Sequence, residues 1–158
     1  INILDFYGNV LRTDVVKDVV ATSNSSVNSC RYILRSDFLT KQDSIFVNIK
    51  YKYDIVSKEN SNLDSISENY ILVYPKELSL PKSNIFMKVE EIGDKYKITL
   101  TSKVFSKYVY ISSDVDGDFD DNYFDMMPSS TKEIIFTPNK KTKGKKANFT
   151  IKNYNNVI

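Results

Sequence analysis

The sequence of 158 residues contains no histidine, no tryptophan and a single cysteine, Cys30. Because histidine is absent, acid or base catalysis by an imidazole is excluded. A structural zinc site is excluded as well, since such a site needs about four Cys or His ligands. One cysteine permits no internal disulfide, which slightly favours a reducing compartment such as the cytoplasm. We therefore predict no metal ion and no cofactor for this chain.

A strong charge of one sign and a long apolar run are also missing. The 22 lysines and arginines nearly balance the 20 aspartates and glutamates, so the formal charge is +2 and indicates no nucleic-acid partner. No apolar run approaches the ~18 residues of a membrane-spanning helix, and Ile1–Phe6 lacks the profile of a signal peptide. We therefore expect no membrane partner. The chain opens with apolar residues and no methionine, as expected for a piece of a longer protein.

Strand-forming side chains are abundant in this sequence. Isoleucine and valine supply 30 residues against 11 for alanine and leucine, and tyrosine with phenylalanine adds 20. Lys95–Thr101 alternates most clearly, with its tyrosine, isoleucine and leucine on one face. Ile85–Glu90 alternates just before it, and Gly93-Asp94 supplies a turn between the two segments. We predict a β-hairpin here.

Further segments of the chain favour short strands, and only one favours a helix. A single helical turn is predicted at Ser36–Leu39, where a serine precedes a brief apolar pair. Many short strands without a βαβ unit indicate an all-β sandwich or barrel. The further predicted strands are Ile1–Phe6, Val10–Leu11, Val15–Val20, Ile45–Tyr53, Tyr70–Tyr74, Tyr108–Ile111, Glu133–Phe136 and Asn148–Asn153.

The alternation stops at Tyr74–Pro81, where two prolines bracket a segment that cannot sit in a central strand. This break divides the chain into halves of similar length. We predict two domains, residues 1–77 and 78–158, each a small antiparallel β-sandwich. Whether the first lacks an opening strand stays open. Small domains bury proportionally less surface, so we expect each to pack on a neighbour.

The segment Asp114–Asn122 carries five carboxylates and resembles a calcium loop in composition. Aligning Gly117 with the glycine of an EF-hand loop places Ser112 at the first ligand position. Tyr123 then stands at the twelfth position, where a bidentate glutamate is required. Two ligands are missing, so the pattern favours a solvated acidic turn over a calcium site.

Two other segments admit a binding role and a plainer one. Asn139–Lys146 holds five lysines but no aromatic or arginine side chain, which favours a surface loop over a nucleic-acid site. Four tyrosines at strand spacing admit stacking on sugars, although packing of one ring face is the commoner role. These tyrosines are Tyr51, Tyr53, Tyr70 and Tyr74. Nothing in the sequence positions a pair of carboxylates for glycoside hydrolysis.

The second half resembles the last immunoglobulin-like domain of β-mannosidases of glycoside hydrolase family 2. The resemblance rests on four pieces in order: Tyr108–Ile111, Gly117–Asp125, Met126-Met127-Pro128 and Glu133–Pro138. In that family a hydrophobic strand is followed by a Gly-x-Phe-x-Asp-Asn-x-Phe turn and a strand ending near proline. The resemblance implies a structural turn formed by Gly117, Phe119, Asp121, Asn122 and Phe124.

The first half resembles the preceding immunoglobulin-like domain of the same enzymes. The matching pieces are Leu4–Leu11, Ser67–Tyr70 and the inter-domain segment Pro75–Pro81. The resemblance implies two tandem immunoglobulin-like β-sandwiches and a parent that removes terminal β-linked mannose by the retaining route. The catalytic TIM barrel of that parent, which would be the partner of this chain, needs ~250 residues and is absent.

No catalytic residue carries over from the family to this chain. The family's acid/base stands in an Asn-Glu dipeptide, and the sequence has only the reverse order, Glu68-Asn69. We therefore expect a non-catalytic structural module. The alternative is a free-standing carbohydrate-binding or adhesive immunoglobulin-like module, which a glycan titration followed by tyrosine fluorescence distinguishes.

Overall fold

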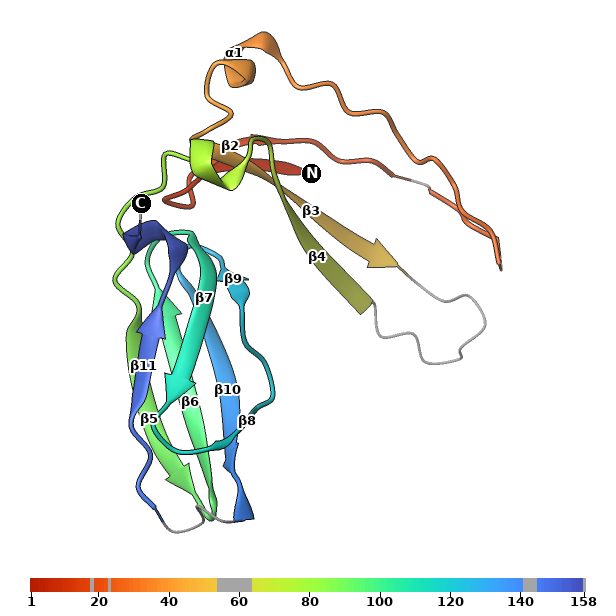
Figure 1. Ribbon diagram of the computed structural model, residues 1–158. Helices are drawn as coiled ribbons and strands as arrows, with labels where there is room; N and C mark the ends of the chain where they lie inside the picture. The colour runs from red at the N-terminus through yellow and green to blue at the C-terminus, as the bar shows by residue number, and fades with distance from the viewer. Residues whose placement is uncertain (18, 23, 54–63, 141–144, 158) are drawn as a thin grey trace. The chain divides into compact units, whose positions relative to one another are not determined.

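The computed structural model describes residues 1–17, 19–22, 24–53, 64–140 and 145–157 (Figure 1). These residues form antiparallel strands and one α-helix, α1, of four residues, so the predicted all-β class is confirmed. None of the described helices is long and apolar enough to cross a membrane. By contact the chain divides into unit 1, Ile1–Asp5 with Asn9–Ser79, and unit 2, Phe6–Gly8 with Leu80–Ile158. Whether each unit folds as a domain of its own stays a prediction.

Unit 2 contains two antiparallel sheets (Figure 1). The four-stranded sheet has the order β5-β6-β10-β8, and the three-stranded sheet has the order β11-β7-β9. The strands of the first are β5 Phe86–Ile92, β6 Lys95–Ser102, β10 Ser130–Pro138 and β8 Gly117–Phe119. Those of the second are β11 Phe149–Lys152, β7 Ser106–Ser113 and β9 Phe124–Met126, and a 3₁₀ turn at Tyr154–Asn156 follows β11.

The core of unit 2 comes from alternate positions of these strands. In β6, Tyr96, Ile98 and Leu100 are buried, which confirms the predicted alternation. The neighbouring strand β10 and the strand β7 of the other sheet contribute further side chains with no exposed surface, among them Phe136 and Ile111. Phe136 contacts three other aromatic rings, those of Tyr96, Phe119 and Phe149. One continuous apolar cluster thus holds unit 2 together.

The predicted hairpin of β5 and β6 is confirmed. Ile92 pairs with Lys95, and the turn between them places Gly93 at a φ of +64°, a conformation that glycine adopts without steric cost. The outer strand β5 is more exposed than its pattern indicated, since the ring of Phe86 is 69% exposed. An edge strand has a neighbour on one side only, so fewer side chains cover it.

The described residues of unit 1 form one antiparallel sheet of order β2-β1-β3-β4 (Figure 1). Its strands are β1 Asn2–Asp5, β2 Val10–Thr13, β3 Ile45–Tyr53 and β4 Asp64–Ile71. Helix α1 at Ser36–Leu39 is the predicted helical turn. Buried apolar side chains lie near the start of β3, at Ile45, Phe46 and Val47, together with Ile3 of β1.

Two strand predictions in unit 1 are wrong. The described part of Val15–Val20 is irregular and exposed, because its valines come in pairs and give neither face of a strand an apolar row. The strand predicted at Tyr70–Tyr74 ends at Ile71 and begins earlier, at Asp64. After it the chain enters a 3₁₀ turn at Pro75–Glu77, where the fixed φ of proline suits the first helical position.

Candidate functional site

The segment Gly117–Asp125 connects the two sheets of unit 2, since β8 lies in one and β9 in the other. Gly117 pairs with Pro138 of β10, and a Cβ placed there would lie 2.5 Å from the ring of Phe136. No larger residue fits without moving that ring or the backbone of β10. The glycine thus allows the segment to lie close against the core.

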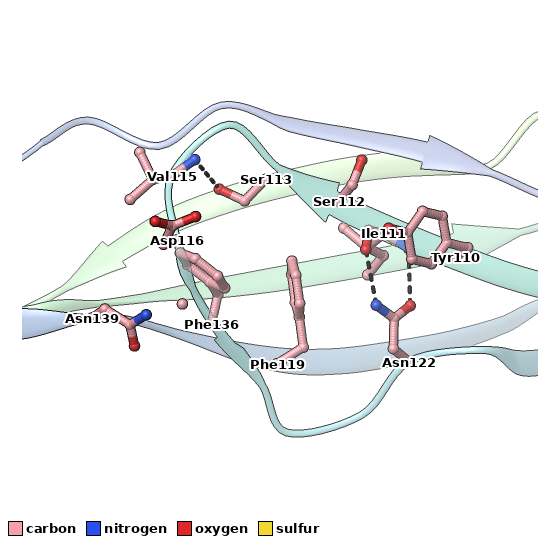
Figure 2. A pocket seen from close by; sticks show the side chains of 11 residues that line it. Tyr110, Ile111, Ser112, Ser113, Val115, Asp116, Phe119, Asn122, Phe136 and Asn139 are labelled. Atoms are coloured by element: carbon pink, nitrogen blue, oxygen red, sulfur yellow. Dashed lines mark hydrogen bonds between the residues drawn. The ribbon is translucent and has the colours of Figure 1, made fainter. Parts of the chain in front are cut away.

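Asn122 fastens this segment to β7 (Figure 2). Its Oδ1 accepts the backbone N–H of Ile111 at 2.9 Å, and its Nδ2 donates to the carbonyl of Ile111 at 2.8 Å. The same Oδ1 accepts the N–H of Tyr123 at 3.1 Å. Asn122 therefore replaces a strand neighbour for one residue of β7.

The other predicted turn residues lie around this link. Phe119 is half-buried, and its ring centroid is 4.7 Å from that of Phe136. Phe124 packs against the same core, and the Nζ of Lys132 lies 4.5 Å from the centre of its ring. Asp121 instead faces outward and pairs with Lys132 at 2.5 Å. The part that these residues play in stability stays a prediction.

Acidic side chains between Asp114 and Asp125 have separate partners, as Asp114 and Asp120 show. Asp114 accepts hydrogen bonds from the backbone and side-chain N–H groups of Asn148, both at 2.8 Å. These bonds lower the pKa of Asp114, and the backbone bond has the larger effect. Asp120 accepts the N–H of Ile135 at 2.9 Å. Within the described ranges, no three acidic or cysteine side chains gather in a way that would hold a metal ion.

A cleft opens between β7 and the segment that follows it (Figure 2). Its volume is about 370 Å³. Aromatic rings and polar side chains share the lining, which includes Tyr110, Ser112, Asp116, Phe119, Asn122 and Asn139. Such a mixture suits a ligand that has both apolar and hydroxyl-bearing surfaces.

A buried ion pair lies near the start of β7, on the side of β7 that pairs with β9. The Nζ of Lys107 is 3.1 Å from Oδ2 of Asp125 and 4.0 Å from the centre of the Tyr108 ring. The side chain of Lys107 is only 7% exposed. Oδ1 of Asp125 also accepts the N–H of Tyr108 at 2.9 Å, so one carboxylate holds two neighbouring residues.

Lys107 was not among the residues predicted from the sequence, although the sequence contains a signal for it. A lysine beside an otherwise apolar strand pattern, Lys107, indicates a bulge or a buried partner. The structure has both, since the pairing of β7 with β9 shifts register between Ser106 and Val109. Tyr108 and Tyr123 have positive φ values of 48° and 61°, which no local sequence pattern indicated.

The tyrosines singled out in unit 1 lie in or near its sheet. Tyr51 and Tyr70 are partly exposed, and Tyr74 is 73% exposed. The hydroxyl of Tyr70 donates to the carboxylate of Glu68, and this bond, with burial second, raises the pKa of Tyr70 to about 12. Tyr53 ends β3, but its side chain lies outside the described residues. Half of the lysine segment, residues 141–144, also lies outside them.

Comparison with known proteins finds one matching family model and a solved structure with the same fold. A family model named Ig_mannosidase, described as an Ig-fold domain, matches residues 80–157. A solved β-D-mannosidase from Dictyoglomus thermophilum shares the fold, with a TM-score of 0.57 and 16% sequence identity. That match covers 96% of this chain and 18% of the mannosidase chain. Among curated proteins no match was found.

The family match falls on the residues of unit 2 that follow Ser79, where the four-stranded and three-stranded sheets enclose one core. The solved mannosidase extends the likeness in fold over nearly the whole chain. This chain spans less than a fifth of the length of that protein. Residues 80–157 therefore belong to the Ig_mannosidase family of Ig-fold domains.

Proposed function

We propose that the chain is a non-catalytic accessory region of a β-mannosidase-like glycoside hydrolase. The match of residues 80–157 to the mannosidase immunoglobulin-fold family carries this proposal. The remaining four fifths of a protein such as the matched mannosidase leave room for a catalytic barrel of about 250 residues. The partner in this proposal is the TIM barrel of the same polypeptide, a retaining glycosidase that removes terminal β-mannose.

The composition of the chain favours an accessory role over a catalytic one. The sequence has no histidine, and its 20 acidic residues include no Asn-Glu dipeptide. In unit 2 the carboxylates of Asp114, Asp120 and Asp125 accept bonds from the protein's own backbone. A carboxylate held in this way braces the fold and is poorly placed to exchange protons with a substrate.

Unit 1 offers surface for such a partner. Tyr51 and Ile66 lie opposite each other on β3 and β4, and both are exposed by nearly half. Tyr70 lies on the same face of the hairpin, four residues further along β4. Side chains of this kind on one face of a single sheet are commonly covered by a neighbouring domain. We assign that face to the contact with the barrel.

The test begins with the gene, whose sequence upstream of Ile1 should encode the barrel. The full-length product should release nitrophenol from an aryl β-mannoside, and the chain of 158 residues alone should release none above a buffer blank. Removing these residues from the full-length product should lower its melting temperature. Replacing Tyr51 by Lys should lower it too, whereas the control Lys50→Gln, on the opposite face of β3, should not.

Two results would contradict the proposal. One is turnover by the chain alone that disappears when a single carboxylate is replaced. The other is a full-length product whose melting temperature and activity are unchanged when the region is removed. The first result would show that the chain is itself catalytic, and the second would show that it does not support a separate catalytic domain.

A further inference from the structure

The outer face of the three-stranded sheet in unit 2 carries four tyrosines. Tyr108 and Tyr110 flank Val109, which is fully buried, so both tyrosines point away from the core. The ring of Tyr123 stacks on Tyr110, with centroids 4.7 Å apart, and the ring of Tyr154 meets Tyr108 edge-on at 6.0 Å. We call Tyr108, Tyr110, Tyr123 and Tyr154 the tyrosine face.

The backbone is bent to present two of these rings. Tyr108 and Tyr123 both have positive φ, a conformation that costs about 1–3 kcal/mol for residues other than glycine. Each is held there by a bond from its own N–H, Tyr108 to Asp125 and Tyr123 to Asn122. Strained residues that the surroundings fix in this way cluster at binding sites. The strain therefore points to a use for the rings beyond packing.

The tyrosine face continues into the cleft beside β7. Tyr110 belongs to both, since it stacks on Tyr123 and lines the cleft (Figure 2). The cleft volume of about 370 Å³ lies near the lower end of the range for small-molecule sites, about 300–1,000 Å³. A ligand can therefore lie across the rings and place one end among the polar side chains of the cleft.

The chemistry of this surface selects the kind of ligand. The outward positions of β7 and β11 beside the tyrosines are Ser112, Thr150 and Lys152, and no outward aliphatic side chain lies among these positions. The hydroxyls of Ser112 and Thr150 lie 2.6 Å apart. Lys107 is paired with Asp125, so the local charges nearly balance. Flat rings, hydroxyl groups and balanced charge suit a neutral sugar chain better than an anion or an apolar peptide.

We propose that the tyrosine face and the adjoining cleft bind a neutral hexose oligosaccharide. The apolar faces of successive sugar rings stack on Tyr123 and Tyr108, and the hydroxyls of the terminal sugar bond in the cleft. No bond is formed or broken, so the site holds a glycan without altering it. This inference goes beyond the accessory role, because it needs no particular parent enzyme.

The test uses the whole chain and a fluorescent reporter. Because the sequence contains no tryptophan, Tyr123→Trp introduces a single one at the proposed site, and Tyr74→Trp introduces one at a matched exposed position of unit 1. Titration with mannohexaose or cellohexaose should change the emission of the Tyr123→Trp protein in a saturable way. The Tyr74→Trp protein should show no saturable change.

Calorimetry on unlabelled protein supplies the second measurement. Tyr123→Ala should weaken binding at least about tenfold, as expected for loss of an anchoring tyrosine. Tyr123→Phe should retain most of the affinity, because the ring is kept, and Tyr74→Ala should retain all of it. Since Tyr123 is 68% exposed, its replacement should leave the melting temperature nearly unchanged and the protein folded.

Three outcomes would overturn the proposal. The first is no saturable binding of either neutral hexaose at ~10 mM, far above the affinity range of a useful site. The second is equal loss of affinity in Tyr123→Ala and Tyr74→Ala. The third is self-association of the chain that Tyr123→Ala abolishes, which would assign the face to a second copy. None of these outcomes bears on the accessory role, which is tested separately by the activity of the chain alone and by removing the region from the full-length product.

Discussion

The two units of the chain bury apolar surface in different ways. In unit 2, two sheets enclose a cluster in which Ile98, Leu100, Ile111, Ile134 and Phe136 have no exposed surface. In unit 1, the described residues form one sheet, and its buried apolar side chains gather near one end of β3. Further along the same hairpin, Tyr51 and Ile66 are exposed.

This difference indicates which unit is stable by itself and which depends on a neighbour. A sheet needs a second layer to bury its apolar face, and unit 2 supplies that layer from its own strands. The described part of unit 1 adds no second sheet, and its segment after β2 is irregular, although it is rich in valine. We infer that unit 2 is the cooperative folding unit and that unit 1 gains stability from a neighbour.

The largest effect on stability is expected in the core of unit 2. Phe136→Ala should lower the free energy of unfolding of unit 2 by about 3–5 kcal/mol, because it removes a fully buried ring that contacts three others. Urea denaturation followed by far-UV circular dichroism measures the loss. The control Phe86→Ala, at an exposed ring of the same unit, should change stability by less than about 0.5 kcal/mol.

A comparable loss for the two phenylalanine variants would contradict a core centred on Phe136. Phe46→Ala in unit 1 sharpens the comparison, since Phe46 is as fully buried as Phe136. If unit 1 gains stability from a neighbour, this variant should cost less in the isolated chain than Phe136→Ala does. Equal costs would indicate that unit 1 has a sufficient core of its own.

The next effect concerns the buried ion pair of unit 2. Asp125→Ala should cost about 2–4 kcal/mol, because Lys107 would keep a charge that is almost fully buried and Tyr108 would lose the acceptor of its N–H. The double variant Lys107→Met with Asp125→Ala should recover part of the loss by removing the unpaired charge. A double variant no more stable than Asp125→Ala would show that the carboxylate acts through Tyr108 alone.

A smaller effect tests the link between Asn122 and β7. Asn122→Ala should lower stability by about 1–3 kcal/mol, since it leaves the N–H and carbonyl of Ile111 without their partner. The matched control is Asn84→Ala, at an exposed asparagine of the same unit. Hydrogen exchange of the Ile111 amide, measured by NMR, should accelerate in Asn122→Ala only. An unchanged exchange rate would remove the structural role of this side chain.

Much of the fold was predictable because strands of unit 2 alternate cleanly. Lys95–Ser102 shows its buried face in the sequence itself, and the glycine of the preceding turn, Gly93, identifies the hairpin. The prediction of a strand at Val15–Val20 is wrong because it rested on valine content and not on a periodic pattern. Strand propensity needs a partner strand to act on, and the structure offers none to the described residues of this segment.

The candidate site was predictable only in its local part. A glycine followed by aspartates and an asparagine indicates a turn, and the structure has residues 120–123 outside regular strands, between β8 and β9. The sequence alone does not decide whether Asp121 or Asn122 closes this turn. The answer depends on Ile111, eleven positions before Asn122, whose backbone groups face it only once the two sheets are packed. The positive φ of Tyr108 likewise depends on Asp125, which is distant in sequence.

The smallest effect compares one carboxylate in each unit. The pKa of Asp14 in unit 1 is lowered chiefly by the bond from Arg12 and next by that from Tyr32, whereas backbone and side-chain bonds from Asn148 lower the pKa of Asp114 in unit 2. A lowered pKa in the folded state means that the stabilisation is present above the unfolded value, near 4, and is lost as the pH falls through the folded value. Melting temperatures should therefore fall below about pH 4, and less steeply in Asp14→Asn and Asp114→Asn.

Raising the salt concentration should change the pKa values of the two carboxylates by different amounts. The partner of Asp14 is the charged, partly exposed guanidinium of Arg12, so raising the salt from about 0.05 to 0.5 M should move the pKa of Asp14 back toward the ordinary value. Asp114 is held by neutral N–H groups, and its pKa should move less. NMR titration of the carboxyl carbons measures both in one sample. A larger salt response at Asp114 than at Asp14 would show that charge, and not the backbone of unit 2, holds the acidic segment in place.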